Sequence, residues 1–433
     1  MKVIMSSLQW AAFILAGAVV VPIVIGEAFD MSSLEISSFL QRTLFVLGVA
    51  GLLQVLLGHR LPLMEGPAGL WWGIFIVYAG LVSSGGLSGE SALRQLEAGM
   101  LISGTLFLIA GFFRWIDAIK QLFTPLVTGT YLILLVSQLS GSFIQGILGI
   151  GYFTDRVDPR VALPAIGVLI FTILLSKSSI PFVRSYSILI SLITGWIVFY
   201  LLRLTKTPSA PAEIFSLPQP LAFGPPELSS GIILSAIMTA MLLLTNMIAS
   251  MKVVENVILA QTETREDPDY NRASIITGVN QWLSGLFAAV GNVPISATAG
   301  FLLTTKTMER LPFIIGSLIV IFISFFPLFT TFAANLPPPL GYAVIFITIA
   351  SLVSLGIREY YSLKMTEQEL FIISLSLMIG IGSLFVPGET LAHLPSSVMS
   401  IANNGLILGT LTCLVLEQIY RGLNRRKERK KSA

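Results

Sequence analysis

The stretch that decides the fold is FAAVGNVPISATAGFLLTTK, residues 287–306, which lies between two long apolar segments. It contains Gly291, Pro294 and Gly300 together with several Ser, Thr and Asn residues. A continuous membrane helix would avoid this composition, so we expect a break. Irregular backbone at membrane depth is tolerated only inside protein or beside a cavity. A half-helix that begins near Pro294 would point the positive end of its dipole into that cavity. The stretch therefore predicts half of a substrate site.

The composition is that of an integral membrane protein. The chain has 433 residues, of which 54% are hydrophobic and only 11% are charged, whereas soluble proteins have about 25% charged residues. Apolar runs long enough to cross a bilayer recur from end to end, so we expect no separate soluble domain. The first run is interpreted as a membrane span and not as a signal peptide, because only Lys2 precedes it and no small-residue cleavage site follows.

The apolar runs predict an all-α membrane protein with fourteen transmembrane segments. We expect the third and the tenth to be only partly helical. The predicted spans are approximately residues 8–26, 37–57, 61–83, 96–113, 121–141, 161–179, 183–203, 229–251, 273–290, 294–306, 312–333, 338–356, 368–386 and 397–418.

The distribution of basic residues predicts the orientation. If the N-terminus is cytoplasmic, twenty of the 26 Lys and Arg residues lie on the inside. This excess agrees with the positive-inside rule, and an even number of spans places both termini in the cytoplasm. We therefore expect a multi-pass protein of the plasma (inner) membrane. The basic run RGLNRRKERKK, residues 421–431, is interpreted as a topology signal that attracts anionic lipid, and not as a nucleic-acid site.

The chain divides into two halves around a proline-rich polar linker, residues 205–228. Seven predicted spans precede it, in residues 1–204, and seven follow it, in residues 229–420. An odd number of spans per half forces the second half to enter the membrane upside down, as in the inverted repeats of many secondary transporters. Residues 421–433 form a basic cytoplasmic tail. The third span, like the tenth, has proline and glycine early in its apolar run.

Several stretches carry a family resemblance. They are LQWAAFILAGAVVVPIVIG (8–26), QVLLGHRLPLMEGPAGLWW (54–72), PLVTG (125–129) and ANNGLILG (402–409). With them the chain resembles the nucleobase/ascorbate transporter family, in particular its uracil and xanthine permeases. The resemblance implies two inverted repeats of seven spans, a core domain and a gate domain. It also implies a substrate held between short strands and half-helices of the third and tenth spans.

The tenth span departs from the family signature. Gly300 fits the glycine of that signature, whereas Ala297 and Thr298 stand where family permeases have a carboxylate or amide followed by Asn. An alanine side chain cannot hydrogen-bond a base. We therefore expect backbone N–H groups to make the contact at Ala297, with the hydroxyl groups of Ser296 and Thr298 beside them.

The eighth span departs as well. Family permeases have a glutamate where this chain has Asn246, and Ser250 follows four residues later on the same helix face. An asparagine both accepts and donates hydrogen bonds, which suits a ring with C=O and N–H edges, but it cannot titrate. Two alternatives stay open: Thr245 is the matching residue if the register shifts by one, and Asn246 can instead bond a neighbouring helix.

The third span and the twelfth span supply the remaining predicted contacts. The residues predicted from the third span are Gly66, Ala68, Gly69 and Trp71. A planar base favours an aromatic face. The family often has Phe where this chain has Gly69, so Trp71 or Trp72 is expected to take its place, the alternative being packing against a neighbouring helix. Tyr342 is predicted to close the site from the gate side.

Glu65 is the predicted proton-coupling group, because an ionisable residue inside a membrane segment indicates function. The alternatives are a cap on the following half-helix and an ion pair with Arg60. We expect no cofactor and no metal, since the chain has a single cysteine, Cys413, and its histidines, His59 and His393, are far apart and are interpreted as loop-end residues.

These observations lead to one main hypothesis and two alternatives. The main hypothesis is a secondary active transporter of uracil, xanthine or a related nucleobase, working by alternating access with proton coupling. An anion transporter of the sulfate or bicarbonate type is the alternative, because half-helix N-termini without nearby carboxylates suit an anion. An enzyme is not expected, since no nucleophile–base pair, metal spacing or phosphate loop is present. The glycine pairs Gly99/Gly104 and Gly146/Gly149 indicate either a homodimer or packing within one chain.

Overall fold

The computed structural model describes residues 2–83, 85–116, 124–154, 156–205, 213–262, 268–361, 363, 365–386 and 405–431. The first half contains α1 (Lys2–Ala18), α2 (Val20–Ala28), α3 (Ser33–Leu56), β1 (Glu65–Pro67), α4 (Gly69–Ser83), α5 (Gly89–Phe112), α7 (Pro125–Ile147), α8 (Pro159–Ser176), α9 (Pro181–Ser185) and α10 (Ser187–Leu201). The second half contains α11 (Ser230–Thr262), α12 (Tyr270–Leu286), β2 (Asn292–Pro294), α13 (Thr298–Thr305), α14 (Arg310–Ser324), α15 (Pro327–Ala334), α16 (Pro338–Tyr361), α17 (Glu367–Ser383) and α19 (Gly405–Lys431).

Each of the fourteen predicted segments contains a described helix. Seven helices within the described part of the chain are long and apolar enough to cross a membrane, or eight if one bent pair counts as a single span. The number fourteen therefore stays a prediction. The predicted starts of the fifth and fourteenth spans, 121–123 and 397–404, lie outside the described residues, as do 206–212 of the linker and His393.

The predicted eleventh span, 312–333, is wrong as a continuous helix. It consists of α14 and α15, which are bent by 83° relative to each other. Pro327 starts α15, and its ring cannot provide the N–H that would continue the hydrogen bonds of α14. Phe326, before this proline, has extended backbone angles, as steric contact with a proline ring requires.

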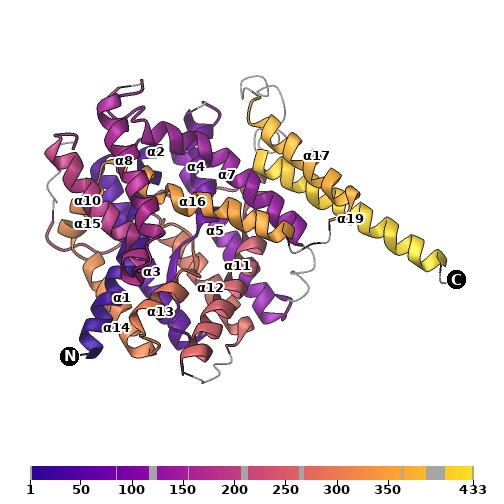
Figure 1. The fold of residues 1–433 in the computed structure, drawn as a ribbon, viewed down its shortest axis with the longest axis horizontal. Coiled ribbons are helices and arrows are strands. Elements are labelled where there is room, and N and C mark those ends of the chain that lie inside the picture. The colour runs from indigo at the N-terminus through magenta and orange to yellow at the C-terminus, as the bar shows by residue number, and fades with distance from the viewer. Residues whose placement is uncertain are drawn as a thin grey trace.

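The helices pack against one another as drawn in Figure 1, and glycines lie at several of their crossings. A methyl group on Gly104 of α5 would lie 2.6 Å from the carbonyl oxygen of Gly278 in α12, and one on Gly129 of α7 would lie 2.8 Å from that of Gly356 in α16. Small residues of this kind let helix backbones approach in membranes. The described contacts of Gly104 and Gly146 are within the chain, to Trp282 and Tyr342, so the homodimer stays a prediction.

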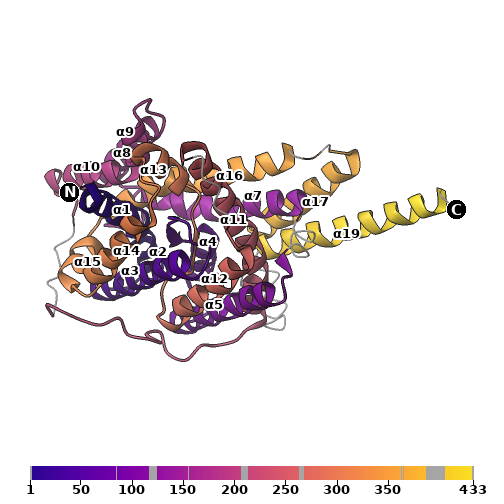
Figure 2. The ribbon, with the colours of Figure 1, turned by 90° about the horizontal axis from the view of Figure 1, so that it is seen from below.

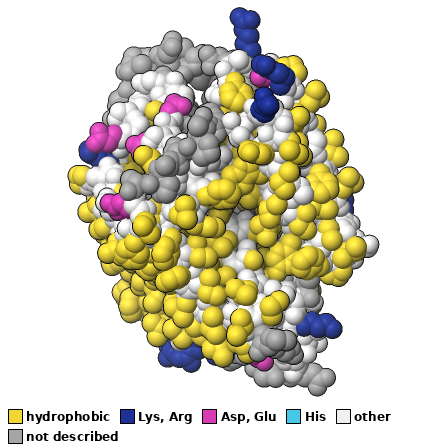
Figure 3. Space-filling view, turned by 90° about the vertical axis from the view of Figure 1, so that its left-hand side faces the viewer, with side chains coloured by type: hydrophobic (Ala, Val, Ile, Leu, Met, Phe, Trp, Pro, Cys, Tyr) yellow, Lys and Arg dark blue, Asp and Glu magenta, His cyan; other side chains and the backbone are white. Residues whose placement is uncertain are grey.

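The surface has the pattern of a membrane protein. An apolar band covers the face in Figure 3, and Lys, Arg, Asp and Glu side chains gather toward its two ends. Many large apolar side chains of the protein are strongly exposed, including those of Leu163 in α8, Leu201 in α10 and Phe322 in α14. Apolar patches of this extent indicate contact with lipid and not with water.

Residues 213–228 of the linker run along the helices in an extended path (Figure 2). The side chain of Gln41 in α3 donates a hydrogen bond of 2.9 Å to the carbonyl oxygen of Ser216. The N–H of Leu221 donates to the carbonyl oxygen of Leu286 at the end of α12, at 2.7 Å. The connection between the two halves is thus fastened to helices of both.

Candidate functional site

The two interrupted segments lie side by side in the centre of the fold. β1 and β2 form an antiparallel pair in which Glu65 is opposite Pro294 and Pro67 is opposite Asn292. Two further backbone bonds extend the pairing: Ala68 N–H donates to the carbonyl oxygen of Gly291 at 2.8 Å, and Ile295 N–H donates to that of Met64 at 2.9 Å. We call this two-stranded structure the ribbon.

Glycines allow the ribbon to form. A side chain on Gly66 would collide with the end of Ile295, and a side chain on Gly291 would collide with the ring of Trp71. Trp71 is fully buried, and its ring also contacts Gly99 of α5, where an added methyl would lie 3.2 Å from it. The structure therefore places Trp71 in the packing behind the ribbon.

Both helices that follow the strands begin at the ribbon, α4 at Gly69 and α13 at Thr298. Because the strands are antiparallel, the positive ends of the two helix dipoles approach the ribbon from opposite directions. Among the described residues, the N–H groups of Gly69 and Leu70 in the first turn of α4, and those of Ser296 and Ala297 just before α13, make no hydrogen bond to the backbone of another segment. Such donors can bind carbonyl oxygens or anions.

The first turn of α13 is partly occupied by its own hydrogen bonds. The N–H of Thr298 donates to the carbonyl oxygen of Ile295 at 3.1 Å, and the N–H of Ala299 donates to that of Ser296 at 3.0 Å. The Thr298 hydroxyl accepts the N–H of Met64 at 3.2 Å. Thr298 is buried and joins the two segments, whereas Ser296 is exposed.

A polar face of α12 supports the ribbon from behind. Gln281 Nε2 donates to the carbonyl oxygen of Asn292 at 2.5 Å, and Asn292 Nδ2 donates to the hydroxyl of Ser284 at 3.0 Å. All three side chains are fully buried. The sequence analysis did not single out these residues. The signal was the spacing of polar residues at 277, 281 and 284, which places them on one helix face.

The predicted pair from the eighth span lies on α11, which contacts β2 and α13. The hydroxyl of Ser250 donates to Oδ1 of Asn246 at 3.2 Å. Ser250 is buried and Asn246 is exposed. The hydroxyl of the alternative residue, Thr245, bonds the carbonyl oxygen of Met241 in its own helix. Asn246 is therefore exposed, as are Ala297 and Gly300 of the neighbouring segment.

Aromatic side chains from three helices meet beside α4. The ring centroids of Trp72 and Phe143 are 5.2 Å apart, and those of Phe143 and Tyr342 are 5.3 Å apart with the rings nearly perpendicular. All three are buried. We call Trp72, Phe143 and Tyr342 the aromatic cluster. It connects α4 with α7 and α16. A methyl on Gly69 would lie 3.7 Å from Leu352 of the same α16.

Glu65 is buried next to a histidine. Its Oε1 lies 3.9 Å from Nε2 of His59, and both side chains are fully buried. Arg60, which the sequence analysis considered as an ion-pair partner, is exposed. His59 was interpreted as a loop-end residue. It does lie in the loop between α3 and β1, but its side chain points inward to the start of the ribbon.

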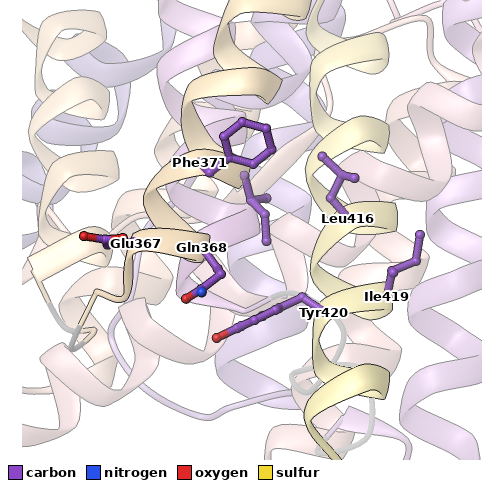
Figure 4. A pocket seen from close by; sticks show the side chains of 7 residues that line it. Glu367, Gln368, Phe371, Leu416, Ile419 and Tyr420 are labelled. Atoms are coloured by element: carbon purple, nitrogen blue, oxygen red, sulfur yellow. The ribbon is translucent and has the colours of Figure 1, made fainter.

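The structure also has a cavity away from the ribbon. It has a volume of about 480 Å³, lies between α17 and α19, and is lined mainly by apolar side chains such as Phe371, Leu416 and Ile419, with Tyr420 at one end (Figure 4). None of the predicted site residues lines it. In the part of the chain that the structure describes, no three His, Cys, Asp or Glu residues are grouped to hold a metal ion.

Comparisons with known proteins agree with the sequence resemblance. The model of the permease family (Xan_ur_permease) matches residues 1–389. The chain belongs to this family. It is 41% identical over 424 residues to the putative purine permease YwdJ of Bacillus subtilis, covering 96% of each protein. It is also 24% identical to the uric acid permease PucJ of Bacillus subtilis, covering 97% of this chain and 92% of that protein, and 23% identical to the xanthine permease of the same organism, covering 99% and 95%.

Solved structures show the same fold. The permease superimposes on the transmembrane domain of the cyanobacterial bicarbonate transporter BicA with a TM-score of 0.61 at 14% identity, covering 96% of both chains. It superimposes on SLC26A9 with a TM-score of 0.65 at 12% identity, covering 95% of this chain and 65% of the other. The family and the fold together confirm a membrane transport protein of the permease type.

Proposed function

We propose that the permease is a secondary active transporter that carries a nucleobase, namely xanthine, uracil or a related purine or pyrimidine, by alternating access. The observation that carries the proposal is the ribbon, with two helix N-termini and unpaired N–H groups, in a chain of the permease family. Relatives named as purine, uric acid and xanthine permeases support a base as the substrate. The same arrangement supports two inverted repeats, because the corresponding strands of upside-down halves would pair antiparallel.

The substrate would contact both broken segments. A base presents C=O and N–H groups in one plane, so it needs donors and acceptors at its edges. The N–H groups of Gly69 and Ala297 are the proposed donors, and Asn246 of α11 provides an amide that both donates and accepts. Gly66 and Ala68 shape the ribbon, and Gly300 leaves open space at α13, where an added methyl meets no atom within 4 Å.

The distribution of exposed residues supports an inward-open state. Ser296, Ala297 and Gly300 are exposed at the start of α13, and the other end of this helix, at Lys306, is predicted to face the cytoplasm. The aromatic cluster is buried and includes Tyr342, near the predicted outer end of α16. We propose that this cluster closes the outer path. Opening on the other side would separate α4 from α7 and α16 and cover the start of α13.

We further propose proton coupling through Glu65, in a plasma (inner) membrane with both termini cytoplasmic. Glu65 is the ionisable group of the ribbon itself, and it is the first residue of β1, the strand that leads into α4. A carboxyl group at this position can take up or release a proton while the strand shifts with the substrate.

Uptake measurements test the proposal. The permease is expressed in a bacterial host without its own base permeases, and uptake of radiolabelled xanthine, uric acid, guanine, hypoxanthine and uracil is compared with that of cells carrying the empty vector. Accumulation of at least one base above this background supports the proposal. No uptake of any base, together with uptake of bicarbonate or sulfate, favours the anion transporter instead. The fold alone does not favour it, because the similarity to anion transporters is at 14% identity or below.

A further inference from the structure

A histidine and a carboxyl group form an isolated buried pair at the ribbon. Nε2 of His59 and Oε1 of Glu65 are 3.9 Å apart, and neither side chain is exposed. Among the described residues, neither Nε2 nor either carboxyl oxygen has a hydrogen-bond partner. A buried carboxylate is unfavourable unless a partner donates a hydrogen bond to it. The two side chains are therefore each other's nearest polar partner at the start of the ribbon.

The orientation of the imidazole is determined by its backbone contacts. Nδ1 of His59 accepts the N–H of Leu61 at 3.0 Å, and the N–H of His59 donates to Oε1 of Gln54 at 3.3 Å. Gln54 is held in turn by its Nε2, which donates to the hydroxyl of Thr277 at 2.8 Å. Because Nδ1 is the acceptor, the neutral ring carries its proton on Nε2, facing Glu65. His59 thus presents an N–H donor to the carboxyl group.

Other charges around the pair are few. The elements packed against β1 include α1, α3 and β2, whose charged residues are Lys2 of α1 and Glu35 and Arg42 of α3. Arg42 has Glu97 of α5 as its electrostatic partner. Arg310 of α14 acts on His59 and opposes a second positive charge there. The proton that the pair exchanges with water therefore belongs to Glu65 and not to His59.

The separation of the His59 and Glu65 side chains depends on the position of the ribbon. A separation of 3.9 Å is beyond hydrogen-bond length, which is about 2.7–3.2 Å for an N–H and an oxygen. Glu65 is part of β1, whereas His59 is fastened to α3 and α12 through Gln54. A displacement of β1 by about one ångström would close the gap. The substrate, bound at the end of the strand, would change the affinity of Glu65 for its proton in this way.

We propose that His59 and Glu65 together form the proton site of the permease: Glu65 binds the cotransported proton, and the Nε2–H of His59 stabilises the carboxylate after that proton has left. The proton comes from water on the outer side and leaves to water on the inner side, and no other reactant takes part. Glu65 carries the proton, and His59 is a positioning residue. This inference rests on the proposed transport function.

Four variants test the pair. Glu65→Gln removes the proton-binding group. His59→Asn keeps an acceptor for the N–H of Leu61 but no longer reaches Glu65, whereas His59→Gln restores an N–H donor at the position of Nε2. Glu97→Gln is the control, because Glu97 is also a fully buried carboxyl group but lies on α5 with Arg42 as its electrostatic partner.

The assay uses proteoliposomes with the full chain and radiolabelled xanthine, or another base that the wild type accepts. Net uptake is measured with and without an imposed pH gradient, and base exchange is measured separately. In Glu65→Gln, we expect stimulation by the gradient to be lost while exchange continues. In His59→Asn, we expect the pH of half-maximal uptake to rise by on the order of one unit, because the carboxylate loses its donor. His59→Gln should return this pH toward the wild-type value, and Glu97→Gln should leave it unchanged.

Two results would overturn the proposal: wild-type stimulation by the gradient in Glu65→Gln, or a pH profile of His59→Asn that coincides with that of the wild type. If the wild type transports no base, the transport function fails, and the pair is tested without substrate. Infrared difference spectra between acid and alkaline samples then decide. The band of a protonated carboxyl group should disappear in Glu65→Gln, shift in His59→Asn and persist in Glu97→Gln, and a wild-type spectrum in all three variants would refute the pair.

Discussion

Gly291→Ala is the substitution that tests the ribbon most directly. The new methyl group would lie 2.6 Å from Cγ and 2.7 Å from Nε1 of Trp71, closer than carbon atoms approach in proteins. The indole has little room to retreat, because Gly99 of α5 lies at its far edge, where an added methyl group would be 3.2 Å from Cη2. The strand must therefore move, which weakens the 2.8 Å bond between Ala68 N–H and the carbonyl oxygen of Gly291.

The expected cost follows from these contacts. Overpacking of a core costs about 1–3 kcal/mol, and loss of one buried backbone hydrogen bond adds about 1 kcal/mol. We expect Gly291→Ala to lower the free energy of unfolding by about 2–4 kcal/mol. Base uptake should fall at least about tenfold, because each 1.4 kcal/mol of lost binding at a displaced site is a factor of ten.

Gly300→Ala is the matched control, since it makes the same chemical change in the same segment. No atom lies within 4 Å of the new methyl group, and alanine is favoured over glycine within a helix by about 1 kcal/mol. Stability is measured by thermal unfolding in detergent, and uptake is measured in proteoliposomes. We expect Gly300→Ala to unfold at or above the wild-type temperature, while the methyl group reduces uptake if the base lies at α13. A Gly291→Ala protein as stable as Gly300→Ala would refute the packing argument.

Substitutions at three further positions address other parts of the site. Tyr342→Phe should keep uptake near the wild-type level and Tyr342→Ala should reduce it, because the ring packs on Phe143; equal uptake by both variants would contradict a role of the ring in closure. Gln281→Leu should lower thermal stability by about 1–3 kcal/mol, since the carbonyl group of Asn292 loses its buried donor, and unchanged unfolding would show that the bond is dispensable. Asn246→Ala should raise the KM for the base by about tenfold without lowering stability, because it removes a hydrogen bond to the base of about 1 kcal/mol or somewhat more. An unchanged KM would exclude contact between Asn246 and the substrate.

The breaks in the membrane helices could be predicted because glycine and proline are visible in the sequence. Pro294 and Gly300 in one half, and Gly66 and Gly69 in the other, each interrupt an apolar run. Their pairing register could not be predicted, because it depends on contacts between segments more than 200 residues apart in sequence. The bend before Pro327 was missed for another reason: a proline near the middle of a span is compatible with either a kinked helix or two helices.

The packing partners of the candidate site residues could not all be predicted from the sequence. Trp71 and Trp72 are neighbours in sequence, and adjacent residues on a helix point in different directions. Composition cannot decide which of them packs behind the ribbon and which joins Phe143. The contact between His59 and Glu65 is local, but it requires the chain to turn at Arg60, which has a positive φ of 60°. Sequence alone gives no strong signal for such a turn at a residue other than glycine.

In the proposed alternating-access cycle, the aromatic cluster would set a balance between conformations. Its two ring pairs, Trp72 with Phe143 and Phe143 with Tyr342, each contribute about 0.5–1.5 kcal/mol beyond simple burial. If both are lost when the outer side opens, the empty carrier would rest about 1–3 kcal/mol in favour of the inward-open form, so that between about one molecule in six and one in a hundred and fifty faces outward. A base arriving from outside would then find few receptive molecules, and its apparent affinity on that side would be reduced by the same fraction. Replacing one of these rings by a smaller side chain would raise the apparent affinity for a base on the outer side. The same change would make it easier for a base to leave the cell by that path.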